Sequence, residues 1–163
     1  MNFSSPSFSL WLMRLSYLVA GAGLFIAMER LGNGEIEPAA AWTSGLVIGG
    51  GGIISFVRHS LFHRSDAVRM QWDLGRRNNF QIEAGFANFA WGAASLAALF
   101  CGWGIKAQGA LIFSYGLYIT MAAALHFVDV FSFRKDGGGS IGGSLITMAF
   151  AVALLVIGVS AIH

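Results

Sequence analysis

Charged residues are scarce in this 163-residue chain: they make up 11% of it, against 56% hydrophobic residues. Soluble domains carry about 25% charged residues, so the composition excludes an ordinary soluble protein and indicates one that lies in a membrane. Two prolines and 22 glycines accompany this apolar content, which is too high for a disordered polypeptide. The single cysteine, Cys101, excludes an internal disulfide.

Long apolar runs are abundant, and a helix of about 20 apolar residues is long enough to cross a bilayer. Five runs have such a length: 8–28, 39–57, 80–101, 109–128 and 142–162. They leave no room for a separate soluble domain. We therefore expect an all-α integral membrane bundle of five transmembrane helices, in which residues 1–163 form one domain.

Lysine and arginine are unevenly distributed between the connections, which predicts the orientation of the chain. Eight of the ten lie on the side of the amino terminus, and two, Arg30 and Lys106, lie on the opposite side. Cytoplasmic loops are enriched in these residues. We expect a multi-pass protein of a bacterial cytoplasmic (inner) membrane, with its amino terminus in the cytoplasm and His163 outside. Basic residues in such loops give no reason to expect nucleic-acid binding.

The connection at 58–79 is the longest one and contains a possible short helix at 65–75. Ser65 or Asp66 could cap its start, and Gly75 could end it. Val68 and Trp72 lie four residues apart, so they would share a face resting on the bilayer surface. A plain solvated loop is the alternative.

Ionisable residues of several expected helices should lie at one depth in the cytoplasmic leaflet. If the third and fourth helices are antiparallel, Glu83 and His126 lie at similar distances from the cytoplasmic surface. Charges in spans are expensive and rare, so we expect partners inside the bundle. The pairs predicted are Glu83 with Arg58 or Arg14, and His126 with Asp129.

The third helix carries a stripe of amide and small residues at alternating spacings of four and three. The members of the stripe are Gln81, Gly85, Asn88, Gly92 and Ser95. Such residues allow close helix contact and hydrogen bonds between helices. Glu83 lies on another side, so this helix should be central. The Gly45/Gly49 and Gly85/Gly92 faces could also join copies or a partner chain in a homo- or hetero-oligomer.

Candidate ligands for a metal ion are present but scattered. His59 and His63 lie four residues apart, and with His126 they could bind a transition metal. His59 and His126 could in principle ligate a haem. Hydrogen-bonded structural histidines are the commoner outcome, and we expect no cofactor.

Arginines are expected at the same depth in the cytoplasmic leaflet as Glu83 and His126, and this leaflet is rich in anionic lipid headgroups. The four expected beside those headgroups are Arg58, Arg64, Arg76 and Arg77. Ordinary enrichment of cytoplasmic loops in positive charge is the alternative.

Recognisable catalytic motifs are lacking, because the sequence has no HExxH, no phosphate loop and no spaced nucleophile, histidine and acid. We therefore do not expect an enzyme. The first functional hypothesis is that a polar cluster in the cytoplasmic leaflet binds or transports a small polar solute, ion or proton. Its candidate residues are Glu83, Asn88, Gln81, His126, Asp129, Arg58 and Arg14. The alternatives are a structural or accessory subunit of a larger membrane complex and a metal- or haem-binding membrane enzyme.

The segments "QWDLGRRNNFQIEAGFANFAWG" and "AAALHFVDV" resemble a family of small bacterial multi-pass membrane proteins known as a domain of unknown function. The matching positions form an F-Q-x-E-x-G-F-A-N helix, with His126 in the next span. Asn79 and Leu125 depart from the family's proline and glycine. The likeness covers roughly residues 70–130, and it implies a multi-span bundle without implying an activity.

Overall fold

The computed structural model describes residues 5–69, 78–132 and 141–163 of the chain. Within these three stretches the chain is helical apart from short connections, and it contains no strand. The expected all-α fold is therefore confirmed for the described residues.

The first two predicted runs form a pair of long antiparallel helices. The first is α1 (Pro6–Gly32), whose Pro6 stands at the helix start, where a missing N–H does no harm. The second runs without a break through α2 (Ile36–Trp42), η1 (Thr43–Gly50), α3 (Gly51–Phe56) and η2 (Val57–Leu61). Its η segments have π-helical turns, which occur in proteins mainly as short interruptions of α-helices.

The remaining helices are α4 (His63–Arg69), α5 (Asn79–Phe100), α6 (Ile105–Ser132) and α7 (Ile141–Ile162). The last three follow predicted runs with small extensions, and the short α4 lies in the 58–79 connection. The Asn78 side chain caps α5 by accepting a 3.2 Å hydrogen bond from the Gln81 backbone N–H. Gly102 and Gly104 have φ of 66° and 89°, a backbone region that favours glycine, and they allow the tight turn into α6.

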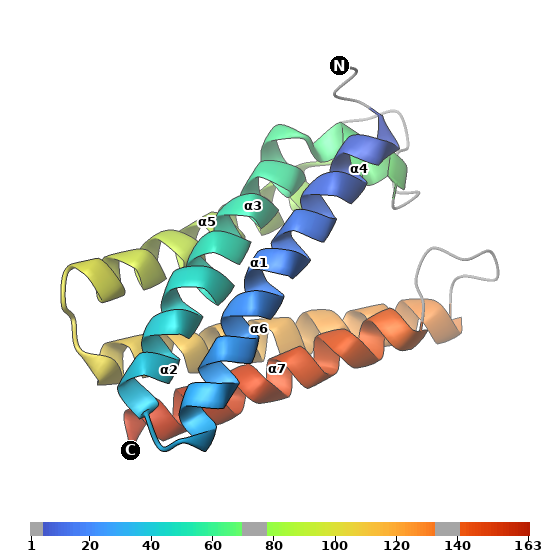
Figure 1. The fold of residues 1–163 in the computed structure, drawn as a ribbon. Helices are drawn as coiled ribbons and strands as arrows, with labels where there is room; N and C mark the ends of the chain where they lie inside the picture. Colours follow the sequence, from blue (N-terminus) through green and yellow to red (C-terminus); the bar gives the residue numbers. More distant parts are fainter. Residues whose placement is uncertain (1–4, 70–77, 133–140) are drawn as a thin grey trace.

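The helices form a body and a hairpin. Helix α5 packs along η1, α3 and η2 on the side away from α1, and α4 packs against α1. The hairpin of α6 and α7 crosses this body near α2 and diverges from it toward the end that carries α4 (Figure 1). The start of α1 lies near α4, whereas the carboxyl terminus lies near α2 (Figure 1).

Glycines set the close contact between α5 and the helix before it. A Cβ atom at Gly52 would lie 2.8 Å from the Asn88 carbonyl oxygen, and one at Gly92 would lie 3.2 Å from that of Gly49. A Cβ at Gly85 would overlap the Ser60 hydroxyl. The two glycine faces considered for oligomer contacts therefore pack against each other within the chain.

Four helical stretches are long and apolar enough to cross a membrane: Pro6–Gly32, Ile36–Leu61, Ile105–Val128 and Ile141–Ile162. Helix α5 has 22 residues but is not one of them, because its sequence is more polar. The composition therefore supports a helical membrane protein, and the fifth expected span depends on where α5 lies.

Candidate functional site

A fully buried carboxylate, that of Asp66 on α4, is the centre of a polar cluster at the α4 end of the body. Its Oδ1 accepts a hydrogen bond of 2.5 Å from the Ser9 hydroxyl of α1. Its Oδ2 accepts one of 2.9 Å from the Gln81 amide of α5. One side chain thus ties together α1, α4 and α5.

Two guanidinium groups contact the same carboxylate. Arg69 Nη2 lies 2.8 Å from Asp66 Oδ1, and Arg58 Nε lies 3.6 Å from it. The arginine side chains are 19% and 13% exposed, so each keeps an edge at the surface. Among the described residues, one carboxylate therefore faces two positive charges.

His59 lies between Arg58 and Asp66. Its Nε2 is 2.5 Å from Arg58 Nη2, and its Nδ1 is 2.8 Å from Asp66 Oδ2. A guanidinium only donates hydrogen bonds, so Nε2 must accept and the ring proton belongs on Nδ1. His59 is then neutral, and it adds no charge to the two arginines. The Nδ1–H does not point straight at the carboxylate, so this contact is electrostatic rather than a well-aligned hydrogen bond.

Burial by itself raises the pKa of Asp66, but its neighbours reverse that effect. The His59 contact, the Arg58 charge and the Ser9 hydroxyl favour the ionised form, and together they hold the pKa of this carboxyl well below its usual range. Asp66 is therefore an anion at neutral pH.

Hydrogen bonds of serine residues hold α4 against the start of α1 beside the cluster. Ser65 Oγ accepts from the Ser9 backbone N–H at 3.0 Å and donates to the Ser5 carbonyl at 2.5 Å. These contacts bury Ser65, Asp66 and Ala67, whereas the sequence predicted a helix at 65–75 resting on the bilayer surface. Helix α4 begins at His63, two residues earlier, and positions 70–75 lie outside the described residues.

Glu83 lies apart from this cluster. Its side chain is exposed, and it forms no ion pair with any described residue. The expected pair with Arg58 or Arg14 does not form, because Arg58 contacts Asp66 and Arg14 is exposed. The cause is the rotation of α5, which turns Gln81 toward Asp66 and Glu83 away from it.

The histidines have different neighbours. His63 Nδ1 lies 3.0 Å from the Ser60 carbonyl oxygen, while His59 belongs to the Asp66 cluster. His126 is half-buried on α6, and the side chain of its expected partner, Asp129, lies outside the described part. Within that part, no three His, Cys, Asp or Glu side chains lie close enough together to hold a metal ion.

A second polar cluster joins α5 to α6 deeper in the molecule. The Asn88 amide donates to the Ala84 carbonyl at 2.7 Å and to the Tyr118 hydroxyl at 3.5 Å. The Tyr115 hydroxyl donates to Asn88 Oδ1 at 3.5 Å.

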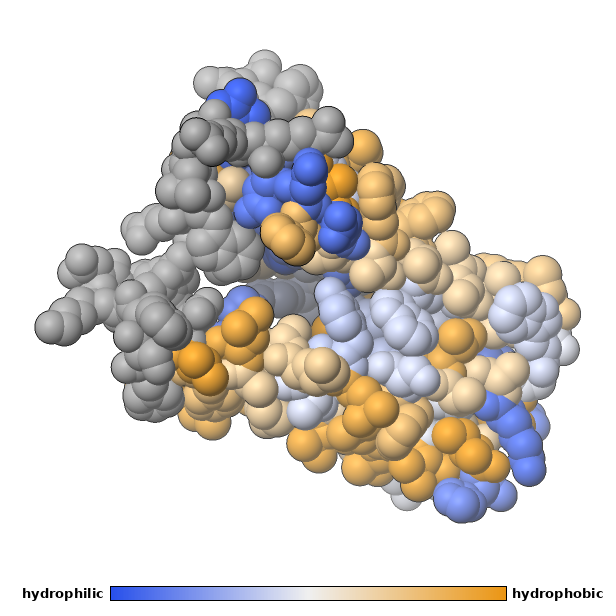
Figure 2. All heavy atoms as spheres, turned by 180° about the vertical axis from the view of Figure 1, so that it is seen from behind, coloured by the Kyte–Doolittle hydropathy of each residue, from blue (hydrophilic) through white to orange (hydrophobic). Residues whose placement is uncertain are grey.

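Beyond the Asn88 contacts, the α6–α7 hairpin leaves the body. The space-filling view from behind shows a recess between the hairpin and the rest of the molecule (Figure 2). Large apolar side chains are exposed on both helices that diverge here, including Phe86 on α5 and Leu125 on α6. The molecule thus combines apolar flanks with polar groups where the helices meet.

Residues 6–162 match a family described as "Family of unknown function (DUF6790)". The chain belongs to this family. The match extends over nearly the whole chain, beyond the resemblance at residues 70–130, and the expectation of an uncharacterised family is confirmed. No curated protein and no solved structure matches the chain.

In this family member, the sequence prediction included Gln81, Asn88 and Arg58 but missed the carboxylate that organises the site. Asp66 was considered only as a helix cap. Its position among the arginines of the 58–79 connection was a usable signal, because the segment has five arginines and only two acids, Asp66 and Asp73, and an acid in a basic segment is a natural ion-pair partner. Tyr115 and Tyr118 were also missed, although they lie three apart on one face of a helix.

Proposed function

We propose that the chain is a five-span protein of the cytoplasmic membrane that binds a phosphate-type anion at its cytoplasmic end. In this arrangement the amino terminus is in the cytoplasm, and the Asp66 cluster lies at the headgroup level beyond Leu61. The observation that carries the proposal is the convergence of two guanidiniums on one carboxylate.

The low hydropathy of α5 is compatible with a membrane crossing. Its 22 residues span about 33 Å at 1.5 Å per residue, enough for a bilayer core. Its polar residues Gln81, Asn88 and Ser95 are buried. Its exposed side chains beyond the second turn include Phe86, Phe89 and Phe100, whereas the exposed Glu83 lies close to its amino-terminal end, near the headgroup level of the proposed crossing.

Cys101 offers a direct test of this crossing, because it is the single cysteine of the chain and is exposed just after α5. Five spans place it outside the cytoplasm, so a membrane-impermeant maleimide should label it in intact cells. Labelling only after the membrane is broken would mean that α5 stays on the cytoplasmic side, and the five-span topology would be wrong.

Charge supports the anion site. Asp66 neutralises one of the two guanidiniums that it contacts, and His59 is neutral. A buried charge without a counter-ion is unfavourable by several kcal/mol. A phosphate group can accept two parallel hydrogen bonds from one guanidinium, and the exposed edges of Arg58 and Arg69 leave these groups accessible to a phosphate. An anionic lipid headgroup and a free phosphate share this chemistry.

Native mass spectrometry can test the site with the full-length protein in phosphatidylcholine nanodiscs. One set would contain phosphatidylglycerol, and a second would receive inorganic phosphate instead. Retention of the anionic lipid alone identifies a headgroup site, and retention of phosphate identifies a free anion. If neither is retained, the anion proposal is wrong.

The variants Arg58→Gln and Arg14→Gln separate this site from general surface charge. Arg58→Gln should weaken retention about tenfold, or roughly 1.4 kcal/mol, whereas the exposed Arg14 is the matched control and should have no effect. Arg58→Lys keeps the charge without the fork, so it should bind with intermediate affinity. Equal losses in Arg14→Gln and Arg58→Gln would contradict a specific site.

A second candidate function is binding of a polar solute or proton in the recess, for which the buried Asn88 with its two tyrosine hydroxyls is the supporting observation. Glu83 and His126 would stand at the sides of the entrance. Folded Glu83→Gln and Asn88→Leu variants should then each impair solute-dependent proton uptake in proteoliposomes. Unchanged uptake in both variants would eliminate this candidate.

A further inference from the structure

A second hollow lies at the opposite end of the molecule, between α2 and the start of α6. It has a volume of about 460 Å³, a size typical of sites for small molecules. Its wall is formed by Glu37, Pro38, Ala41, Gly102, Gly104, Ile105 and Gln108. Neither the anion site nor the recess uses any of these residues.

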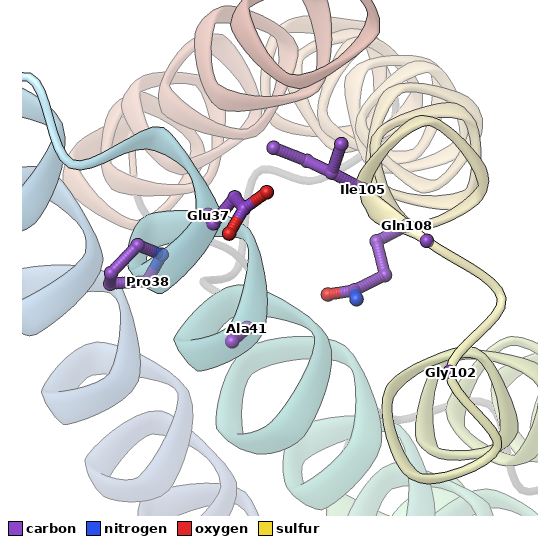
Figure 3. A pocket seen from close by; sticks show the side chains of 7 residues that line it. Glu37, Pro38, Ala41, Gly102, Ile105 and Gln108 are labelled. Carbon is purple, nitrogen blue, oxygen red and sulfur yellow. The ribbon is translucent and has the colours of Figure 1, made fainter.

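Two polar side chains point into this hollow. The Glu37 carboxylate projects from α2, and the Gln108 amide projects from α6 (Figure 3). Gln108 Oε1 is buried and accepts no hydrogen bond from any described residue. A buried acceptor without a donor is unfavourable, so a ligand that donates a hydrogen bond to this oxygen would be stabilised in the hollow.

The charge of the hollow is negative. Of the nearby cations, Arg30 is paired with Glu35 at 2.8 Å and with Glu29 at 3.4 Å, and Lys106, which follows Ile105 on α6, is exposed and does not line the hollow. Glu37 forms no ion pair within the described part of the chain. A ligand for this place should therefore carry positive charge and hydrogen-bond donors.

The geometry points to a binding site for a small organic amine in its protonated form. An ammonium group has three donors and no acceptor, so it can bind the Glu37 carboxylate, and a turn of the Gln108 amide toward the hollow would let Oε1 accept from the same group. Pro38, Ala41 and Ile105 supply apolar walls for a short alkyl chain. A bare Ca²⁺ ion fits less well, because it takes six to eight oxygen ligands and only two side chains here offer oxygen atoms.

Saturation-transfer NMR with n-butylammonium tests this site on the full-length protein in detergent micelles. The neutral probe n-butanol, which has the same alkyl chain, controls for partition into the micelle. We expect butylammonium to receive saturation from the protein and butanol to receive much less. Equal transfer to both probes, or none to butylammonium at millimolar concentration, would overturn the assignment.

Glu37→Gln should reduce the affinity for butylammonium about tenfold, because it removes the only unpaired carboxylate on the wall while keeping its shape. Glu29→Gln is the control, since Glu29 is an exposed acid of the same region that does not line the hollow. Ala41→Leu should also weaken binding by filling the space without changing the charge. Unchanged affinity in Glu37→Gln and Ala41→Leu would refute the site.

Discussion

Replacement of Asp66 by asparagine is the sharpest test of the polar cluster. The substitution keeps the size of the side chain but removes its charge and turns one acceptor oxygen into a donor. Arg58 and Arg69, whose side chains are 13% and 19% exposed, would then lack their carboxylate. The new NH₂ group would also face donors, because Ser9 and Gln81 both donate to Asp66.

Loss of one partner from a buried ion pair typically destabilises a protein by about 3–5 kcal/mol. Asp66 has no exposed surface, so water cannot replace its contacts without local opening. We therefore expect Asp66→Asn to lower the free energy of unfolding by about 3 kcal/mol or more. The assay is unfolding at pH 7 in detergent micelles, followed by the loss of helical circular dichroism.

Glu83→Gln is the matched control because it makes the same chemical change on an exposed carboxylate. Surface substitutions usually change stability by no more than about 0.5 kcal/mol, so this variant should unfold like the wild type. If Asp66→Asn also stayed within that range, or if both variants lost the same stability, the role assigned to Asp66 would be refuted.

Three further outcomes follow from the same contacts. The folded-state pKa of Asp66 is depressed, so this carboxylate stabilises the fold fully above its unfolded pKa of about 3.9 and progressively less as the pH falls below that value. In acid unfolding curves, the wild type should therefore lose up to about 1.4 kcal/mol of unfolding free energy per pH unit from this group, and Asp66→Asn should not. Ser9→Ala should lower the unfolding free energy by about 1.5–3 kcal/mol, because it removes a hydrogen bond to a charged group, and an unchanged midpoint would contradict this contact. Gly85→Ala should destabilise the protein by about 1–3 kcal/mol, because the new methyl group would overlap Ser60. Gly21→Ala has open space around it and should stabilise the protein by up to about 1 kcal/mol. Thermal unfolding compares the two variants, and equal effects would mean that the helices are not in close contact at Gly85.

Helix positions were predictable because apolar runs and helix length are properties of the local sequence. The predicted run at 80–101 corresponds to α5 at Asn79–Phe100, and the run at 142–162 corresponds to α7 at Ile141–Ile162. The stripe containing Gln81 and Asn88 was correctly placed on one buried face of α5. Spacing alone sufficed for this, since residues three and four apart share a helix face.

The partner of each polar group was less predictable. Glu83 and Asp66 are both carboxylates near the same end of the molecule, and the sequence favoured Glu83 because it lies within an apolar run. The structure buries Asp66 instead, through contacts with residues up to 57 positions away. The divergence of α6 from α5 likewise depends on how the hairpin crosses the body.

The sequence by itself determined that this protein is helical, where its helices lie, and which face of α5 is buried, because hydropathy and periodicity act over one or two helical turns. Only the tertiary structure decided that Asp66 is the buried anion and that Glu83 is exposed. The physical reason is that the rotation of a helix and the position of α4 depend on contacts between residues that are far apart in the sequence, such as those at Gly52 and Gly85. No local pattern encodes these contacts.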